Sequence, residues 1–225
     1  MVLTDNLVAY YKLDGNANDS HGTYNGTVSG AATTSTGKIN TAYTFDGDDY
    51  ISIGRPVTNN FSISLWVKIT EFPSTTTPRQ ICTLGGDSAT PSPTNYFYVT
   101  TTQDDIINAG NHASGIVTDT LSTGVWYHIV YMSSTSSSEL YINGVSQGTG
   151  SGQSEYSSGY CAIGNLRSQD DCVNGIIDEV GIWSRALTAS EVEELYNSGA
   201  GLSYPFTGGG ISNTNFFTLT MGAEC

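Results

Sequence analysis

Short runs rich in β-branched and aromatic residues, separated by turn-forming residues, recur along most of this 225-residue chain. Several alternate apolar and polar side chains, which is the pattern of a strand with one face in a core. Asn143-Gly144 follows one run and predicts a type I′ hairpin turn, because both residues tolerate a positive φ. The sequence therefore predicts an all-β fold, a two-sheet antiparallel jelly-roll sandwich. The clearest runs are residues 7–13, 42–45, 50–53, 61–69, 96–100, 125–132, 139–142, 160–163 and 175–183.

One short C-terminal helix interrupts the strands. Thr188 and Glu191 have the spacing of a capping box, in which each side chain binds a free backbone amide of the first helical turn. Gly199 predicts a left-handed stop at the other end. The apolar residues expected on one face of the helix are Val192, Leu195 and Tyr196.

The charge balance limits the partners of the chain. It has 21 acidic and 7 basic residues, a formal net charge of −14. Such a surface repels phosphate backbones, so we expect no nucleic-acid partner, while divalent cations are attracted. No run reaches the roughly 18 apolar residues that a membrane span needs, so we expect no membrane insertion.

The first residues of the chain lack the basic and apolar segments of a signal peptide. Either such a segment has been removed, or the protein leaves its cell by another route, such as lysis. We expect the protein outside the cell or on a virion surface.

The four cysteines, Cys82, Cys161, Cys172 and Cys225, form no CxxC pair, which argues against a zinc knuckle. Cys161 and Cys172 could close a short loop, but four cysteines allow three pairings. Isolated buried thiols are the alternative.

The composition changes after Gly201. Three glycines at 208–210 predict a flexible hinge, and residues 215–220 predict one more apolar strand. We therefore expect a domain over residues 1–200 and a hinged arm over residues 201–225. The arm could fold back on its own sandwich or add to a neighbouring subunit, which would make residues 207–225 a homo-oligomer contact.

The order of motifs resembles the LamG-like jelly-roll domains of the concanavalin A-like lectin/glucanase superfamily. The resemblance covers about residues 7–198 and leaves out most of the tail. The matching segments are LVAYYKLDGNANDS at 7–20, YTFDGDDYI at 43–51, FSISLWVK at 61–68, WYHIV at 126–130, LYING at 140–144 and GIIDEVGIWSRALT at 175–188.

The resemblance implies a jelly roll whose first strand lies near the strand carrying Asp178. It also implies a structural calcium ion and ligand binding at a concave face or rim. Our candidate calcium ligands are Asp14, Asn16, Asn18 and Asp19, whose oxygens alternate in a glycine-containing loop, joined by Asp178. The alternative is an Asx-rich turn, in which these side chains bind only nearby backbone amides.

A second acidic group, Asp46, Asp48 and Asp49, is interpreted as a solvated turn. Three acids so close together repel one another unless a cation or a set of amides neutralises them.

Catalytic patterns are missing from the sequence. The hydrolases of the superfamily resembled carry Glu-x-Asp-x-Glu on one strand face, and no such run occurs here. Asp178 and Glu179 are adjacent, so regular alternation would point them to opposite faces. No Gly-x-Ser-x-Gly elbow between strand and helix occurs, and the histidines are scattered, with His128 expected to be bonded internally. We therefore expect no enzyme.

Aromatic platforms combined with polar side chains are typical of sugar sites. Trp66, Trp126 and Trp183 lie inside strand motifs and are expected in the core, so loop residues are the better candidates. The ligand-binding candidates are Asn95, Tyr96, Tyr156, Asn165, Arg167 and Asp170.

The leading hypothesis is a non-catalytic binding or adhesion module, lectin-like, with carbohydrate as ligand and calcium as a structural ion. Its partner would be a glycan or a protein of a cell or virion surface. The alternative is a structural assembly protein, such as a phage virion decoration or surface-layer subunit, that uses its C-terminal arm for contacts. A glycan-active hydrolase is the third hypothesis.

Overall fold

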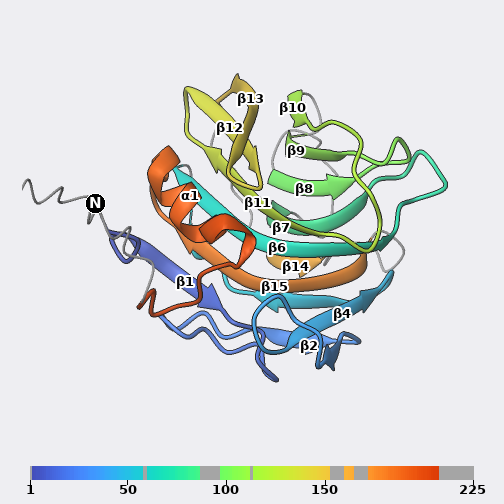
Figure 1. Ribbon diagram of the computed structural model, residues 1–225, viewed down its shortest axis with the longest axis horizontal. Helices are drawn as coiled ribbons and strands as arrows, with labels where there is room; N and C mark the ends of the chain where they lie inside the picture. The colour runs from blue at the N-terminus through green and yellow to red at the C-terminus, as the bar shows by residue number, and fades with distance from the viewer. Residues whose placement is uncertain are drawn as a thin grey trace, which may run out of the picture.

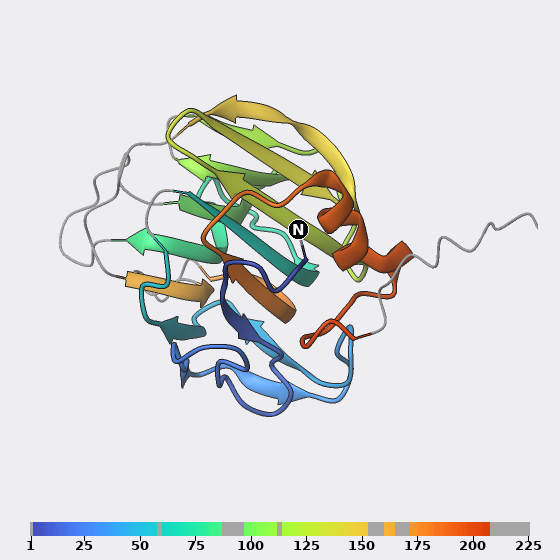
Figure 2. The same cartoon turned by 90° about the vertical axis from the view of Figure 1, so that its left-hand side faces the viewer.

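The computed structural model describes residues 2–57, 60–86, 97–111, 114–152, 160–164 and 172–207. In these residues the chain forms two antiparallel sheets packed face to face (Figures 1 and 2), which confirms the predicted sandwich. The larger sheet runs β13 (Val145–Ser151), β12 (Ser137–Ile142), β11 (Trp126–Ser133), β6 (Phe61–Glu71), β15 (Asn174–Trp183), β4 (Ala42–Asp46) and β3 (Ala32–Thr34), with β1 (Leu7–Tyr11) also paired to β15. The smaller sheet runs β10 (Ser114–Val117), β9 (Ile107–Asn111), β8 (Phe97–Thr101), β7 (Arg79–Gly86), β14 (Tyr160–Gly164), β5 (Tyr50–Ile53) and β2 (Thr27–Ser29).

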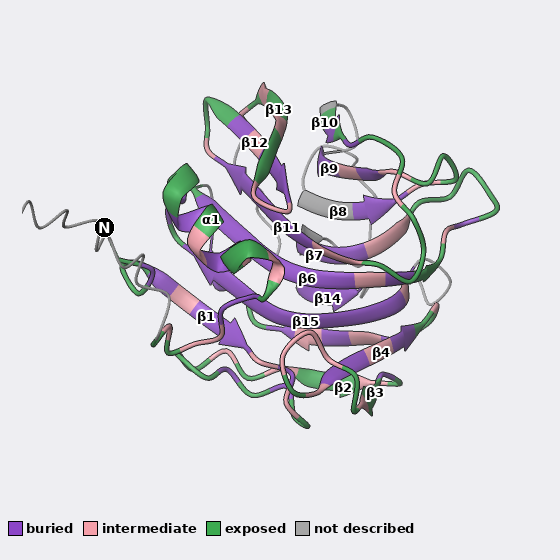
Figure 3. Ribbon diagram, in the orientation of Figure 1, coloured by how far each residue is buried: buried purple, intermediate pink, exposed green. Residues whose placement is uncertain are grey.

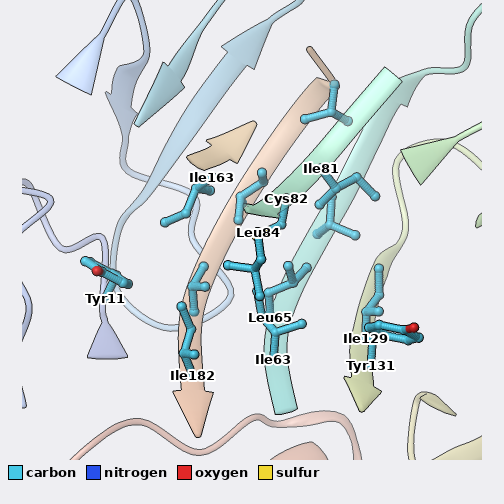
Figure 4. Packing of buried hydrophobic residues seen from close by; sticks show 14 of the residues in the cluster. Tyr11, Ile63, Leu65, Ile81, Cys82, Leu84, Ile129, Tyr131, Ile163 and Ile182 are labelled. Atoms are coloured by element: carbon cyan, nitrogen blue, oxygen red, sulfur yellow. The ribbon is translucent and has the colours of Figure 1, made fainter. Parts of the chain in front are cut away.

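The main core lies between the two sheets. Alternate residues of β6 and β11, such as Ile63, Leu65 and Ile129, meet Cys82 and Ile163 of the smaller sheet (Figure 4). β6 and β15 are buried along almost their whole length, whereas β13 is largely exposed (Figure 3). The continuous apolar sequences of β6 and β15 fit this burial, because both faces of these central strands are covered.

A second apolar cluster covers part of the outer face of the larger sheet, meaning the face turned away from the smaller sheet. Helix α1 (Ala189–Tyr196) and the segment 200–206 lie across this face (Figure 2). In this cluster, residues from both ends of the described chain pack against residues of the sheet. Its buried members are Leu3, Leu7, Tyr10, Val130, Met132, Tyr141, Trp183, Leu187, Val192, Leu195 and Leu202.

The helix begins as its sequence predicts. The Thr188 hydroxyl accepts from the Glu191 amide, and the Glu191 carboxylate accepts from the Thr188 amide, so the capping box is present. Glu191 also pairs with Arg185 at 2.6 Å. The end differs from the prediction, because Asn197, at φ 48°, is the left-handed C-cap, and Gly199 instead ends the short 3-10 turn Asn197–Gly199.

The N-terminal residues are fastened to the helix end of the molecule. The Arg185 guanidinium donates to the backbone carbonyls of Asp5 (2.8 Å) and Val2 (3.3 Å). The Trp183 indole N–H donates to the carbonyl of Leu3 at 2.6 Å. Without these bonds, the polar groups buried in the cluster would lack hydrogen-bond partners.

Two predictions are confirmed, one from the family resemblance and one from the turn sequence Asn143-Gly144. β1 pairs with β15, with Tyr10 opposite Gly181, so the first strand does lie beside the strand that carries Asp178. Asn143 (φ 51°) and Gly144 (φ 80°) form the turn between β12 and β13. Residues 201–206 pack against Tyr10, while the boundary drawn at residue 200 stays a prediction.

β15 contains a bulge that overturns one expectation. Asp178 lies opposite Trp66, but the register shifts before Gly181 meets Ser64, and Glu179 takes φ 50°. Trp66 and Ser64 share the outer face, which therefore also carries Asp178. The Glu179 carboxylate lies on that face too, because it accepts from the hydroxyl of Tyr10, a member of the outer cluster, at 2.6 Å. The expectation of opposite faces was wrong, since a bulge breaks the strand alternation.

Cys82, Cys161 and Cys172 are buried thiols, and burial raises the pKa of the Cys82 thiol. Cys225 lies outside the described residues. Within the described residues, no helix is long and apolar enough to cross a membrane.

Candidate functional site

Asp19 organises a turn rather than facing solvent. Its carboxylate is nearly buried and accepts four backbone N–H bonds. These donors hold the pKa of Asp19 below its ordinary value, although burial alone would raise it. The donors to Oδ1 are Tyr10 (2.9 Å), His21 (3.0 Å) and Gly22 (2.9 Å), and the donor to Oδ2 is Tyr24 (3.0 Å).

Asp14 and Asp178 hold the two sides of the loop 37–41. Asp14 Oδ1 accepts from the Thr41 amide at 3.0 Å, and Asp14 Oδ2 accepts from the Asn40 side chain at 3.1 Å. Asp178 Oδ2 accepts from the Ile39 amide at 2.9 Å. The loop therefore follows a fixed path between the end of β1 and the bulge of β15.

The predicted calcium ligands do not form one cage. In the described parts of the chain, the carboxylate oxygens of Asp14, Asp19 and Asp178 are not gathered within 4.8 Å of one another. Asn16 accepts from the Asn18 amide at 2.9 Å, which is an Asx turn. The observed bonds match the Asx-turn alternative, and calcium at these residues stays a prediction.

The acids that do gather are Asp46, Asp48 and Asp49, in the turn between β4 and β5. Their carboxylate oxygens lie within 4.8 Å of one another. Burial raises the pKa of the Asp49 carboxyl, and the charges of Asp46 and Asp48 raise it further, against a hydrogen bond from the Asp46 amide. A hard cation would relieve this repulsion, so this donor set fits calcium, which prefers carboxylate oxygens.

The outer face next to helix α1 carries lysines stacked on tryptophans. Lys38 Nζ lies 4.2 Å from the centroid of the Trp66 ring, and Lys68 Nζ lies 5.1 Å from that of Trp126. Trp66 and Trp183 are buried as predicted, but Trp126 is only half-buried, so the expectation that all three lie in the core was wrong for Trp126. We call Lys38, Trp66, Lys68 and Trp126 the lysine–tryptophan patch.

Strand register places these residues side by side. Trp126 of β11 lies opposite Lys68 of β6, and Lys68 lies opposite Ile176 of β15. Trp66, two residues before Lys68, lies on the same face and stacks on Tyr196 of the helix, with ring centroids 5.9 Å apart. The patch is therefore the continuation of the outer face beyond the part that α1 covers.

Two acids on the outer face, Asp178 and Glu179, are buried and have raised pKa values. Burial raises the pKa of Asp178 to about 8 and that of Glu179 to about 7. Their residues are 0% and 3% exposed, and Tyr10, which donates to Glu179, also contacts the carbonyl of Leu202 at 3.2 Å. Buried in this way, the pair cannot reach a glycosidic bond.

Two further polar groups of catalytic type in the described residues, those of His128 and Ser146, make structural contacts. His128 is buried, its Nε2 lies 2.8 Å from the Ser64 hydroxyl, and burial lowers its pKa to about 3, so the ring is neutral. Internal bonding of this histidine is confirmed. Ser146 lies between two glycines in the order Gly-x-Ser-x-Gly, but it belongs to β13 and donates to Glu139, so it is no nucleophile elbow.

Sequence reasoning placed the ligand in loops that the structure does not describe. All six ligand-binding candidates lie outside the described residues, as does most of the predicted arm. They are Asn95, Tyr96, Tyr156, Asn165, Arg167 and Asp170. The lysine–tryptophan patch was missed, although the alternation of Trp66 with Lys68 and of Trp126 with His128 was a usable signal.

A family model described as the concanavalin A-like lectin/glucanases superfamily matches residues 45–193. A search of the curated proteins found no match.

Several solved structures share the fold. Domain 4 of AbnA, a GH43 extracellular arabinanase from Geobacillus stearothermophilus, solved with arabinotriose, has 24% identity and a TM-score of 0.67 over 84% of this chain and 97% of that one. The binding domain of Paraclostridial Mosquitocidal Protein 1 has 18% identity and a TM-score of 0.67, over 88% of this chain and 53% of that one. A Trypanosoma rangeli sialidase has 17% identity and a TM-score of 0.71, over 89% of this chain but only 34% of its own.

Proposed function

The chain belongs to the concanavalin A-like lectin/glucanase superfamily, and we propose that it is a non-catalytic carbohydrate-binding module. The observation that carries this proposal is the likeness to domain 4 of the arabinanase, which was solved with a bound oligosaccharide. That domain matches over nearly its full length, so the likeness concerns a whole binding unit. The fold alone would not specify the function, because this kind of scaffold hosts several.

The geometry of the acids supports the non-catalytic part. Glycoside hydrolysis needs two carboxyl groups that flank the scissile bond in an open site. The adjacent pair with raised pKa values, Asp178 and Glu179, is closed off by Tyr10 and Leu202. Asp46, Asp48 and Asp49 bring carboxylate oxygens within 4.8 Å of one another at a single turn, and this spacing suits a cation.

Calcium belongs to this proposal as a structural ion at the turn between β4 and β5. Asp46, Asp48 and Asp49 would hold it, and its charge would neutralise their repulsion. The turn leads directly from the larger sheet into the smaller one, so a bound ion would fix the relation of β4 to β5.

The test is binding of the purified chain to a panel of oligosaccharides, arabinotriose included, by calorimetry, with each sugar analysed for cleavage afterwards. We expect saturable binding to at least one glycan and no new reducing ends. A folded chain that binds none of the glycans would overturn carbohydrate binding. Accumulation of cleaved product, lost in Asp178→Asn with Glu179→Gln, would overturn the non-catalytic assignment.

A further inference from the structure

Two lysines that have no carboxylate partner among the described residues lie on one face of an acidic molecule. Of the 7 lysines and arginines in the chain, Lys38 and Lys68 lie on the outer face beside helix α1. In the part of the chain that the structure describes, the ion pair present is Arg185–Glu191, so neither lysine has a carboxylate within 4.0 Å. In a chain of net charge −14, such a surface attracts anions that the rest of the molecule repels.

The position of Lys38 is built by the fold. Asp178 binds the Ile39 amide and Asp14 binds the Thr41 amide, so the backbone on the C-terminal side of the lysine is fixed. A Cβ on Gly37 would collide with the carbonyl of Thr41, so the preceding residue is tightly placed as well. Burial lowers the pKa of Lys38, and the ammonium group rests on the Trp66 ring.

Lys68 and Trp126 extend this surface along the sheet. Both are only partly buried, so both can contact a ligand. Ile176, which is buried, and Thr44 continue the same row across β15 and β4. Asp178 lies opposite Trp66, but its carboxylate is buried and accepts from the Ile39 amide, while Asp46 and Glu71 each lie opposite Asn174 at the end of the strands.

We propose that the lysine–tryptophan patch binds a glycan that carries carboxylate groups. This rests on the proposed carbohydrate-binding function and adds its ligand class and location. A sugar ring has an apolar face that packs on the exposed part of Trp126, as aromatic side chains offer large apolar surfaces. Its carboxylate pairs with Lys68 or Lys38, whose ammonium groups the indole rings hold in place.

The test compares tetragalacturonate with its fully methyl-esterified form, which has the same sugar rings but no charge. We expect the carboxylated probe to bind the wild-type chain at least tenfold more tightly than the ester, with affinity that falls as salt rises. Lys38→Gln and Lys68→Gln should each remove most of this preference, and the double variant all of it.

Arg79→Gln is the matched control, because it removes one positive charge from β7 of the other sheet. It should keep the preference for the carboxylated probe. Trp126→Ala should weaken both probes about tenfold, and Trp126→Phe should restore much of that loss. Melting temperatures of all variants, measured without ligand, identify any that fail to fold.

Equal affinity for the acid and the ester would overturn the proposal, as would loss of the preference in Arg79→Gln. Binding of a neutral glycan that the patch variants leave unchanged would also overturn it, while leaving the carbohydrate-binding function intact. If no glycan of any charge binds, the proposed function itself fails.

Discussion

Two groups of aspartates in this molecule differ in what surrounds their carboxylate oxygens. Asp14, Asp19 and Asp178 each accept backbone N–H bonds and lie apart from one another. Asp46, Asp48 and Asp49 converge within 4.8 Å, and the pKa of Asp49 is raised in part by its neighbours. Amides neutralise the first group, whereas in the second group the Asp46 amide donates to Asp49 and the three carboxylates lie against one another.

The difference shows that the spacing of acids along a chain does not define a cation site. A carboxylate satisfied by amides loses little when no ion is present, because its charge is already stabilised. Converging carboxylates repel one another, and an ion would relieve that strain. The first group thus shapes loops, and the second group is the better candidate for calcium.

The largest effect should come from Asp19→Ala. This change leaves four backbone N–H groups without their acceptor, and we expect it to lower the free energy of unfolding by about 4 kcal/mol. Urea denaturation measures this. Asp48→Ala, at an exposed residue of the other group, should cost less than about 0.5 kcal/mol. Similar losses in both variants would break the distinction between the two groups.

The next largest effect should be a loss of stability as the pH rises. Asp178 and Glu179 have folded-state pKa values of about 8 and about 7, above those of the unfolded chain. The folded state therefore binds more protons, and the stability that this confers is complete below about pH 4 and is lost as the pH rises through 7 and 8.

We expect a fall of about 3 kcal/mol between pH 6.5 and pH 9, measured by urea denaturation at each pH. Asp178→Asn cannot ionise at that position, so its unfolding free energy should change much less over this range. An unfolding free energy that instead increases with pH would contradict the assigned pKa directions.

Calcium should separate the two groups directly. At a free calcium concentration ten times the Kd, the ion should raise the free energy of unfolding by about 1.4 kcal/mol, visible as a higher melting temperature that a chelator reverses. Asp46→Asn or Asp48→Asn should abolish this shift, and Asp14→Asn should leave it unchanged. The reverse result would place the ion at the loop of Asp14 and refute the site at the β4–β5 turn.

Within the group of aspartates that bind amides, the smallest effect should come from Asp14→Ala. Its carboxylate is partly exposed and binds the Thr41 amide and the Asn40 side chain, both of which water can reach after the change. We expect a loss of about 1 kcal/mol in denaturant unfolding. A loss as large as that of Asp19→Ala would mean that the loop 37–41 is needed for the whole sandwich.

Much of the fold was predictable, because apolar alternation marks the strands that bury a face. β5 was predicted with its observed bounds, and β6, β11 and β15 within two residues at each end. The strands missed by sequence reasoning include β13 and β2, which are largely exposed, and also β7, whose residues Ile81, Cys82 and Leu84 are buried. The exposed strands exist because a neighbouring strand pairs with them, and the pattern within the segment carries little signal.

The candidate site was less predictable, for two physical reasons. The bulge at Glu179 turns two adjacent carboxyls to one face, and nothing in the residues 178–179 marks the extra residue in the register. The lysine–tryptophan patch joins residues from a loop and two strands, so its neighbours are set by pairing across the sheet. Trp126 is half-exposed because helix α1 stops covering the sheet before it reaches this residue, and that extent is set by tertiary packing.

The central place of β15 also bears on how the protein is made. This strand pairs with β1, β4 and β6, all of which precede it by a long stretch of chain, and Leu7 finds its partner only at Trp183. During synthesis the open edges of β1 and β4 must wait for the strand that joins them. Pairing between such distant segments makes folding slow, and edges left open in the meantime attract other chains. The interval before residue 183 emerges is therefore when these unpaired edges are most open to contact with other chains.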